Sequence, residues 1–216
     1  MNLLVMAKAP VAGRSKTRLC PPCTPLEAAA LAEAALADTL DAVAGAAGAA
    51  GARPVLALEG EPGRWLPPGY TVVAQRGRGF DERLANAWDD VGGPGFQIGM
   101  DTPQLTPPAL EAAMRALGTA GTDAVIGLAT DGGWWGIGLR RPDRRVFLGV
   151  PMSTATTGAI QLARLGDLGL SVALLAELRD VDRMDDARAV AAEAPATRFG
   201  AAVAALDLPA LEGVAP

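Results

Sequence analysis

Histidine is absent from this 216-residue chain, and lysine occurs only at Lys8 and Lys16. The absence of histidine excludes Ser-His-Asp and Cys-His catalysis and removes the most common general base. Any catalysis must therefore rest on carboxylates, lysine, arginine, backbone amides or a bound metal. All the other basic residues are arginines. The two neighbouring lysines therefore indicate a local requirement for them, or they are chance survivors of a coding bias.

Cysteine is nearly absent as well, with a single pair at Cys20 and Cys23. A structural zinc site needs four ligands, and the chain has no further cysteine and no histidine to complete one. We interpret the pair as two reduced thiols, with a redox pair as the alternative.

Long apolar runs and an excess of positive charge are also missing. No stretch approaches the roughly 18 apolar residues of a membrane span, and the run at 2–7 is too short for the core of a secretory signal. We therefore expect a cytoplasmic protein with no membrane partner. The net charge of −5 argues against nucleic acid as a partner, because an acidic protein repels a polyanion. The sequence does not indicate an oligomeric state.

Half of the residues are hydrophobic, so the chain can bury a full core, and its length suits one domain over residues 1–216. Short apolar runs alternate with helically spaced ones, which predicts an α/β fold with a mixed, mostly parallel sheet and helices on both faces. Strands are predicted at 2–7, 54–58, 70–74, 96–99, 123–128, 136–139 and 171–175. Helices are predicted at 25–43, 80–91, 107–117, 157–168, 182–193 and 198–206. In such sheets ligands bind beyond the carboxyl ends of the strands, so the loops 8–18 and 99–103 should share one crevice.

A basic loop follows the first predicted strand. It carries four cations and a glycine: Lys8, Gly13, Arg14, Lys16 and Arg18. Glycine allows the backbone to approach an oxyanion, and lysine and arginine neutralise it, which favours binding of a nucleotide's phosphates. The spacing is not that of a Walker A loop. A solvated basic loop without a ligand is the alternative.

Three groups of carboxylates follow along the chain. Asp101, just past a predicted buried strand, suits a hard cation such as Mg²⁺ or Mn²⁺ that bridges phosphates, or else caps a local turn. Asp131 precedes two glycines and an indole, in the run Gly132, Gly133, Trp134. It could act as a general base or hold an acceptor against the indole, or the run could be a plain hairpin turn.

The third group spans residues 180–186. Asp180 is a candidate second metal ligand, because it precedes the predicted helix and could reach the crevice. Asp182 and Asp185 have a spacing like that of a capping box, which predicts helix capping as the role of one of them. Pure helix capping is the alternative for the whole group.

Taken in this order, the motifs resemble the glycosyltransferase-like family described as arsenosugar-biosynthesis or radical-SAM-associated glycosyltransferases. That family belongs to the nucleotide-diphospho-sugar transferases, which have the GT-A fold. The resemblance covers nearly the whole chain and includes segments 75–83 and 153–154. It implies that Lys16 and Arg18 hold the donor's phosphates and that Thr154 lies near the acceptor.

The resemblance also implies that Asp101 occupies the position of the superfamily's metal-binding aspartate. The chain has Gly99 where the first aspartate of an Asp-x-Asp motif would stand, so Asp180 or Asp182 would have to complete the metal site. Trp134 stands where the family usually has tyrosine, and Met152 where it often has tryptophan.

The expected function is a metal-dependent glycosyltransferase that uses a nucleotide-diphospho-sugar donor and a small-molecule acceptor. The segment 12–19 is also similar to guanylyltransferases that activate phosphorylated metabolites with a nucleoside triphosphate, so nucleotidyl transfer is the main alternative. A non-catalytic nucleotide-binding protein is a second alternative.

Overall fold

The first strand is buried on both faces, and its alternating side chains define the layers of the molecule. The computed structural model describes residues 1–206. In it, strand β1 (Asn2–Lys8) directs Leu3, Val5 and Ala7 into one apolar cluster and Leu4 and Met6 into another. A strand buried on both faces is typical of a sheet that helices cover on both sides.

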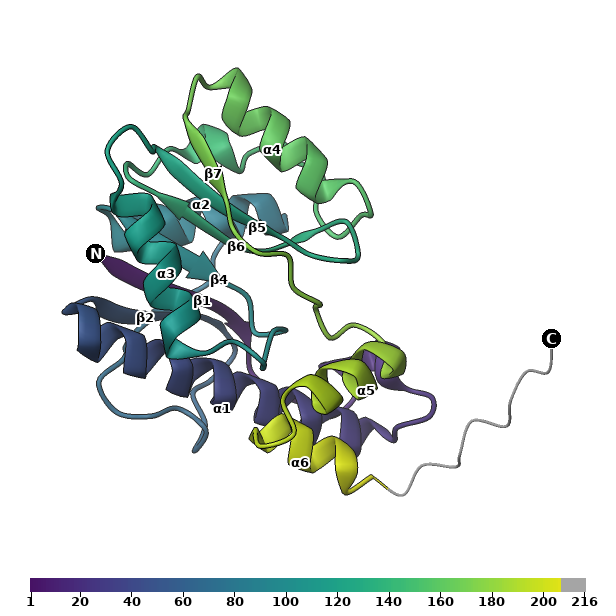
Figure 1. The fold of residues 1–216 in the computed structure, drawn as a ribbon. Coiled ribbons are helices and arrows are strands. Elements are labelled where there is room, and N and C mark those ends of the chain that lie inside the picture. Colours follow the sequence, from purple (N-terminus) through teal and green to yellow (C-terminus); the bar gives the residue numbers. More distant parts are fainter. Residues whose placement is uncertain (207–216) are drawn as a thin grey trace.

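Seven strands form one mixed sheet (Figure 1). After β1 they are β2 (Arg53–Glu59), β3 (Thr71–Ala74), β4 (Gly95–Ile98), β5 (Ala124–Leu128), β6 (Trp134–Leu139) and β7 (Val172–Leu174). Their order is β3-β2-β1-β4-β6-β5-β7, and β6 is antiparallel to both of its neighbours while all other pairs are parallel. The predicted mixed, mostly parallel α/β fold is therefore confirmed.

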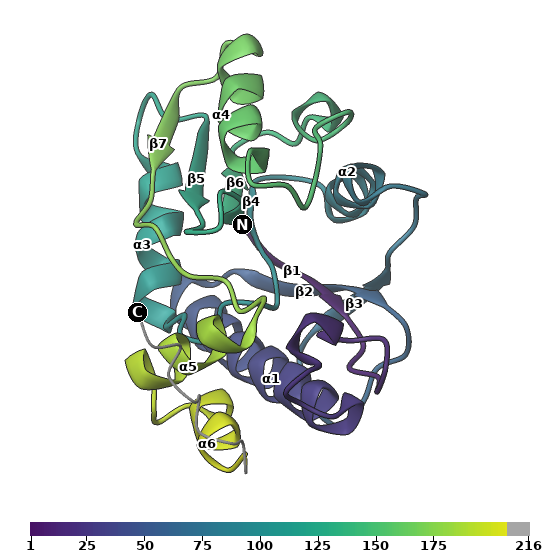
Figure 2. The same ribbon diagram turned by 90° about the vertical axis from the view of Figure 1, so that its right-hand side faces the viewer.

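Helices cover both faces of this sheet, as Figures 1 and 2 show. Helices α1 (Pro25–Ala50) and α3 (Pro107–Gly118) pack against one face, and α2 (Phe80–Val91) and α4 (Thr157–Asp167) pack against the other. Short 3-10 turns at Thr17–Leu19 and Arg144–Val146 were not expected from the sequence. Helix α1 begins at a capping box between Thr24 and Glu27. It continues beyond the predicted end at 43 to its cap at Gly51.

A third apolar cluster joins the C-terminal helices to the start of α1. Helices α5 (Met184–Glu193) and α6 (Arg198–Ala204) pack against the N-terminal half of α1. Leu19, at the end of the basic loop, is fully buried in this cluster. The basic loop is therefore anchored at its far end by apolar packing.

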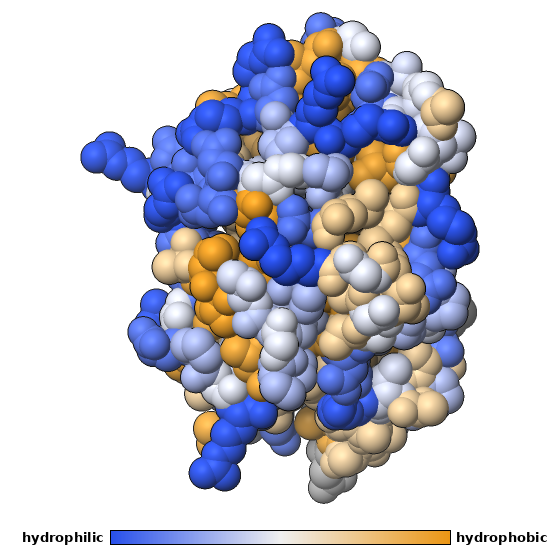
Figure 3. Space-filling model, turned by 90° about the vertical axis from the view of Figure 1, so that its left-hand side faces the viewer, coloured by the Kyte–Doolittle hydropathy of each residue, from blue (hydrophilic) through white to orange (hydrophobic). Residues whose placement is uncertain are grey.

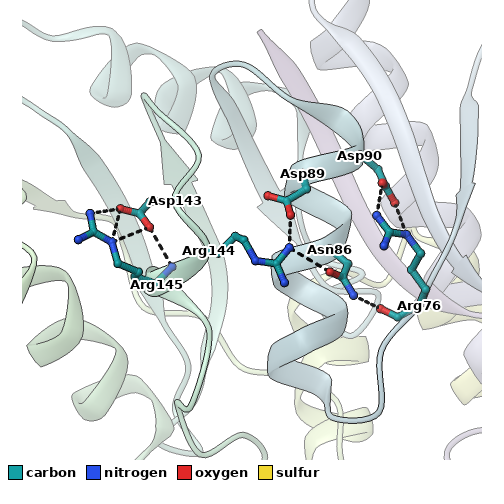
Figure 4. A network of polar contacts seen from close by, with 7 residues as sticks. All are labelled: Arg76, Asn86, Asp89, Asp90, Asp143, Arg144 and Arg145. Carbon is teal, nitrogen blue, oxygen red and sulfur yellow. Dashed lines mark hydrogen bonds and ion pairs between the residues drawn. The ribbon is translucent and has the colours of Figure 1, made fainter.

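A polar network holds α2 in place (Figure 4). Arg144 donates to Asn86 (3.1 Å) and pairs with Asp89, while Asn86 donates to the carbonyl of Arg76 (2.7 Å). Arg76 in turn pairs with Asp90. These contacts join α2 to the chain before it and to the 3-10 turn at Arg144–Val146, so the position of α2 is defined through its second half.

Surface polarity is mixed on the face drawn in Figure 3, where hydrophilic residues cover much of the upper part and apolar residues lie in separate groups. Within residues 1–206, no helix combines the length and the apolar character that crossing a membrane requires.

Candidate functional site

A buried serine stabilises the conformation of the basic loop after β1 through two hydrogen bonds. Ser15 Oγ accepts the Val11 N–H (3.0 Å) and donates to the Ala9 carbonyl (3.1 Å). Gly13 has a φ of 74°, in the left-handed region where glycine is unstrained. Lys16 follows with a φ of 49°, which is uncommon for a residue with a side chain. The loop therefore holds Lys16 in a fixed position near the end of β1.

Three segments that are far apart in sequence meet at this loop. Lys16 Nζ lies 2.7 Å from a carboxylate oxygen of Asp101 and also donates to the carbonyl of Val181. Arg18 pairs with Asp182 at 2.6 Å. The backbone N–H of Val181 donates to the Asp101 carbonyl (2.8 Å). The prediction that the loops 8–18 and 99–103 share one crevice is confirmed, and the segment 180–182 lies beside them.

All four predicted phosphate-binding cations line one cavity of about 240 Å³, which we call the basic pocket. Among them, Lys8 pairs with Glu59 at 3.6 Å. Lys16 is nearly buried, with 9% of its side chain exposed, whereas 59% of the Arg18 side chain is exposed. The cavity is lined by Lys8, Arg14, Ser15, Lys16, Thr17, Arg18, Ala32, Met100, Asp101 and Asp182.

A second cavity of about 370 Å³ adjoins the basic pocket, and we call it the acidic pocket. The two cavities share the lining residues Arg18, Asp101 and Asp182. Asp131 and Asp180 also line the acidic pocket, so it has four carboxylates and one guanidinium. Its remaining lining residues are Met6, Phe80, Gln97, Gly99, Thr102, Gly133, Trp134, Trp135, Ser153, Thr154, Ala155 and Thr157.

Asp180 is the most perturbed acid of the site. Its Oδ1 is buried and has no hydrogen-bonding partner among residues 1–206. Burial first, and then the nearby carboxylates of Asp101 and Asp131, raise the pKa of Asp180 to about 8, against an opposing effect of Lys16. Crowded carboxylates with one unpaired oxygen form an environment that a hard cation would relieve.

The predicted metal ligands can hold such a cation only together with further oxygen donors. Over residues 1–206, no three acidic or cysteine side chains converge closely enough to form a metal site by themselves. Mg²⁺ is usually held by one or two carboxylates together with substrate phosphates and water. Asp101 and Asp180 fit this open arrangement, in which phosphates in the basic pocket would supply further oxygens. Asp182, the third predicted ligand, is engaged by Arg18, and Asp101 is engaged by Lys16, so either acid would have to exchange its cation for a metal.

The segment 131–133 forms the turn of the hairpin between β5 and β6. Asp131 Oδ1 accepts the Gly133 N–H (2.8 Å), which leaves Oδ2 free of that bond. Gly132 has a φ of 89°, and a Cβ at this position would lie 2.0 Å from the Ala155 carbonyl oxygen. The Gly158 N–H of α4 donates to the Gly132 carbonyl (2.8 Å). The paired glycines therefore let the turn dock against the start of α4.

The two adjacent tryptophans face opposite sides of the sheet, as expected for neighbours on a strand. Trp135 is buried, stacks edge-on against Phe96 and donates from Nε1 to the Ala176 carbonyl (3.0 Å). Trp134 is only partly buried and lines the acidic pocket. Thr154 lines the same pocket just before α4, next to Ser153 with its φ of 59°.

Two features of the site were not predicted. Phe80 is the first residue of the predicted helix 80–91, yet it is 45% exposed and lines the acidic pocket. The capping role predicted for Asp182 and Asp185 is wrong, because Asp186 caps the backbone N–H of Arg183 and α5 begins at Met184. Asp182 is thereby free to pair with Arg18.

Comparisons with known proteins agree with the fold. The profile of one family, described as uncharacterized proteins conserved in bacteria (DUF2064), matches residues 28–154. The crystal structure of a proposed nucleotide-diphospho-sugar transferase from Desulfovibrio desulfuricans G20 is similar with a TM-score of 0.82 and 24% identity, over 94% of this chain and 95% of that one. No curated protein matches the chain in sequence.

A more distant similarity extends to a nucleotide-binding enzyme. The structure of CMP:2-keto-3-deoxy-manno-octonic acid synthetase in complex with CTP has a TM-score of 0.54 and 12% identity, over 89% of this chain and 98% of that one. At these identities the likenesses establish the fold, which is that of the nucleotide-diphospho-sugar transferases.

Proposed function

The chain belongs to the family of uncharacterized proteins conserved in bacteria (DUF2064), and we propose that it is a metal-dependent glycosyltransferase with a nucleotide-diphospho-sugar donor. One observation carries this proposal. A pocket with four cations and a pocket with four carboxylates adjoin at the sheet, and they share Asp101, Asp182 and Arg18. The fold of the nucleotide-diphospho-sugar transferases supports the same assignment.

In this proposal the basic pocket binds the donor's diphosphate. Lys16 and Arg18 neutralise its oxygens, and Lys8 and Arg14 line the same cavity. Asp101 and Asp180 would hold Mg²⁺ or Mn²⁺, and the ion would neutralise the charge on the leaving diphosphate. Lys16 and Arg18 stabilise that same charge as it develops.

Asp131 is the proposed general base. Its Oδ1 is fixed by the Gly133 N–H, so the carboxylate has a defined orientation in the acidic pocket. An acceptor hydroxyl attacks the anomeric carbon while its proton passes to Asp131 Oδ2. The bond from the anomeric carbon to the diphosphate oxygen breaks, and its electron pair leaves with the nucleoside diphosphate.

Nucleotidyl transfer is the second candidate, and the fold shared with the CTP-bound synthetase favours it. In that reaction the basic pocket would hold a nucleoside triphosphate, and pyrophosphate would leave. The second substrate would be a phosphorylated metabolite.

Thermal unfolding with a panel of donors tests the choice. The full chain is heated with UDP-, GDP- and ADP-sugars or with the four nucleoside triphosphates, each with and without Mn²⁺. A ligand present at 100 times its Kd adds about 2.7 kcal/mol to the free energy of unfolding. We expect stabilisation by a nucleotide sugar with Mn²⁺. If nucleoside triphosphates stabilise the chain and no nucleotide sugar does, glycosyl transfer is rejected.

Two variants locate the binding. Lys16→Gln and Arg18→Gln should each raise the Kd of the donor at least tenfold, because each removes a positive charge from the basic pocket. The donor-dependent rise in unfolding temperature should shrink accordingly. Arg115→Gln is the matched control, since Arg115 is an exposed arginine of α3 whose one ion pair within residues 1–206 is with Glu111 in the same helix. An equal loss of donor affinity in all three variants would show that the nucleotide binds outside the basic pocket.

A further inference from the structure

Unpaired buried polar atoms gather at the acidic pocket. Among residues 1–206, five buried side-chain nitrogens or oxygens have no hydrogen-bonding partner, and three of them belong to residues that line this pocket. They are Thr102 Oγ1, Trp134 Nε1 and Asp180 Oδ1. Folded proteins leave few such atoms unpaired, because each gives up its bonds to water without replacement. In the proposed function the metal would take up Asp180 Oδ1, and the atoms of Thr102 and Trp134 point to a further ligand that would pair with them.

Thr102 gives the clearest evidence of the three for a missing hydrogen-bonding partner. It is 1% exposed, so its hydroxyl is neither hydrated from the surface nor bound within the described part of the chain. It follows directly on Asp101, at the boundary between the two pockets. A threonine hydroxyl can both donate and accept, and therefore pairs well with another hydroxyl or with an amino group.

Apolar surface lies beside these polar atoms. The indole of Trp134 lines the pocket, and Phe80 contributes a half-exposed ring from the first turn of α2. The polar network of Figure 4 holds that helix in position. Aromatic faces next to scattered hydrogen-bonding groups suit a molecule with a flat apolar side and several hydroxyl or amino groups.

The charges of the pocket restrict the ligand further. Its one guanidinium, Arg18, is already paired with Asp182. Asp131 has no ion-pair partner among residues 1–206 and lines the acidic pocket, whereas Lys16 lines the basic pocket. A phosphorylated or carboxylated molecule placed against Asp131 would meet a like charge in a pocket whose lining has four carboxylates and one already paired guanidinium, which disfavours binding.

We propose that the acidic pocket is the acceptor subsite and that it takes an uncharged or cationic molecule with several hydroxyl or amino groups, and excludes phosphorylated acceptors. This inference rests on the proposed function, in which the donor occupies the basic pocket. It also separates the two candidate reactions, because nucleotidyl transfer to a phosphorylated metabolite would bring an anion into this pocket.

Matched pairs of small molecules test the proposal. The probes are glucose, glucosamine and glycerol, each paired with its phosphate monoester, and binding to the full chain is measured by tryptophan fluorescence and calorimetry. We expect the unphosphorylated member of at least one pair to bind at least tenfold more tightly than its phosphate. Tighter binding of the phosphate monoesters, or no binding of any pair, would overturn the proposal.

Two threonine variants locate the bound probe. Thr102→Val keeps the shape of the side chain and removes a hydroxyl that has no internal partner, so the unfolding temperature should stay the same or rise while probe affinity falls at least fivefold. Thr39→Val is the control, because Thr39 is equally buried but donates to the Ala35 carbonyl (2.9 Å) in α1, away from the pocket. It should leave probe binding unchanged. A fall in stability for Thr102→Val with no change in affinity would assign the hydroxyl a structural role and overturn the proposal.

Donor binding is measured separately, so the two proposals fail in different ways. A nucleotide sugar that binds in a Lys16-dependent manner, with phosphorylated probes preferred, would reject the acceptor class and retain the donor site. Probe selectivity that depends on Thr102, without any nucleotide binding, would reject the proposed transferase. It would retain the selectivity of the acidic pocket for unphosphorylated molecules.

Discussion

Replacing Asp180 by asparagine should remove a pH-dependent destabilisation of the metal-free protein. Burial and the carboxylates of Asp101 and Asp131 raise the pKa of Asp180 from its ordinary 3.8 to about 8 in the folded chain. Between these two values the folded state keeps a proton that the unfolded state has released. The contribution of Asp180 to stability is therefore complete below about pH 4 and is lost as the pH rises toward 8.

The size of the effect follows from the pKa difference. One pKa unit corresponds to about 1.4 kcal/mol, so wild type should lose about 3 kcal/mol relative to Asp180→Asn between pH 5 and pH 7.5. The assay is urea unfolding of both proteins at the two pH values with EDTA present. Added Mn²⁺ at pH 7.5 should stabilise wild type and leave Asp180→Asn unchanged.

Asp185→Asn is the control for this experiment, because the Asp185 side chain is 88% exposed and lies only five residues further along the chain. Its free energy of unfolding should follow that of wild type at both pH values within about 0.5 kcal/mol. If the free energies of unfolding of Asp180→Asn and wild type also change in parallel with pH, the surroundings of Asp180 do not keep its carboxyl group protonated, and the reasoning is refuted.

Three further predictions concern the scaffold. Gly132→Ala should lower the free energy of unfolding by more than about 2 kcal/mol, since its Cβ would lie 2.0 Å from the Ala155 carbonyl oxygen at a φ of 89°; an unchanged melting temperature would contradict this geometry. Thr24→Ala should cost about 1 kcal/mol in urea unfolding, because it removes the N-terminal cap of α1, and no loss would show that α1 does not depend on that cap. Iodoacetamide should label Cys20 before Cys23 in a mass-spectrometric time course, because burial raises the pKa of the Cys23 thiol, and equal rates would argue against that burial.

The elements of the fold were predictable because their signals are local. A short continuous apolar run predicts β1, and a Thr-Pro start with Glu27 three residues after Thr24 predicts the beginning of α1. The end of α1 was less predictable. Gly45 and Gly48 weaken a helix in isolation, but packing of Ala46 and Ala47 in the core continues it to Ala50.

The position of Phe80 shows where such local signals fail. The spacing of Phe80, Leu84 and Trp88 is helical, and Leu84 and Trp88 are indeed buried. Phe80 occupies the first turn of α2, where its side chain lines the acidic pocket and is half-exposed. Periodicity specifies the face of a helix that a residue occupies, whereas the extent of the neighbouring layer determines whether that face is covered at the helix end.

The ion pairs at the centre of the site depend on contacts that no sequence spacing reveals. The sequence predicts the cations Lys16 and Arg18 for phosphates and the acids Asp101 and Asp182 for a metal. In the folded chain each of these cations is paired with one of these acids, at 2.7 Å for Lys16 with Asp101 and 2.6 Å for Arg18 with Asp182. Phosphates alone would have to separate both pairs and leave the carboxylates beside new negative charge.

A metal–diphosphate unit lowers this penalty, because the phosphates replace the acids as partners of Lys16 and Arg18 while the cation replaces the amine as the partner of Asp101. If the proposed function is correct, the metal and the nucleotide must therefore strengthen each other's binding, and by the same factor, since such coupling is reciprocal. Either ligand alone should bind more weakly than it does in the presence of the other. A nucleotide affinity that is the same with EDTA as with Mn²⁺ would show that the basic pocket works without the carboxylates, and that the two ion pairs serve only to join the loop 8–18 to the segments around Asp101 and Asp182.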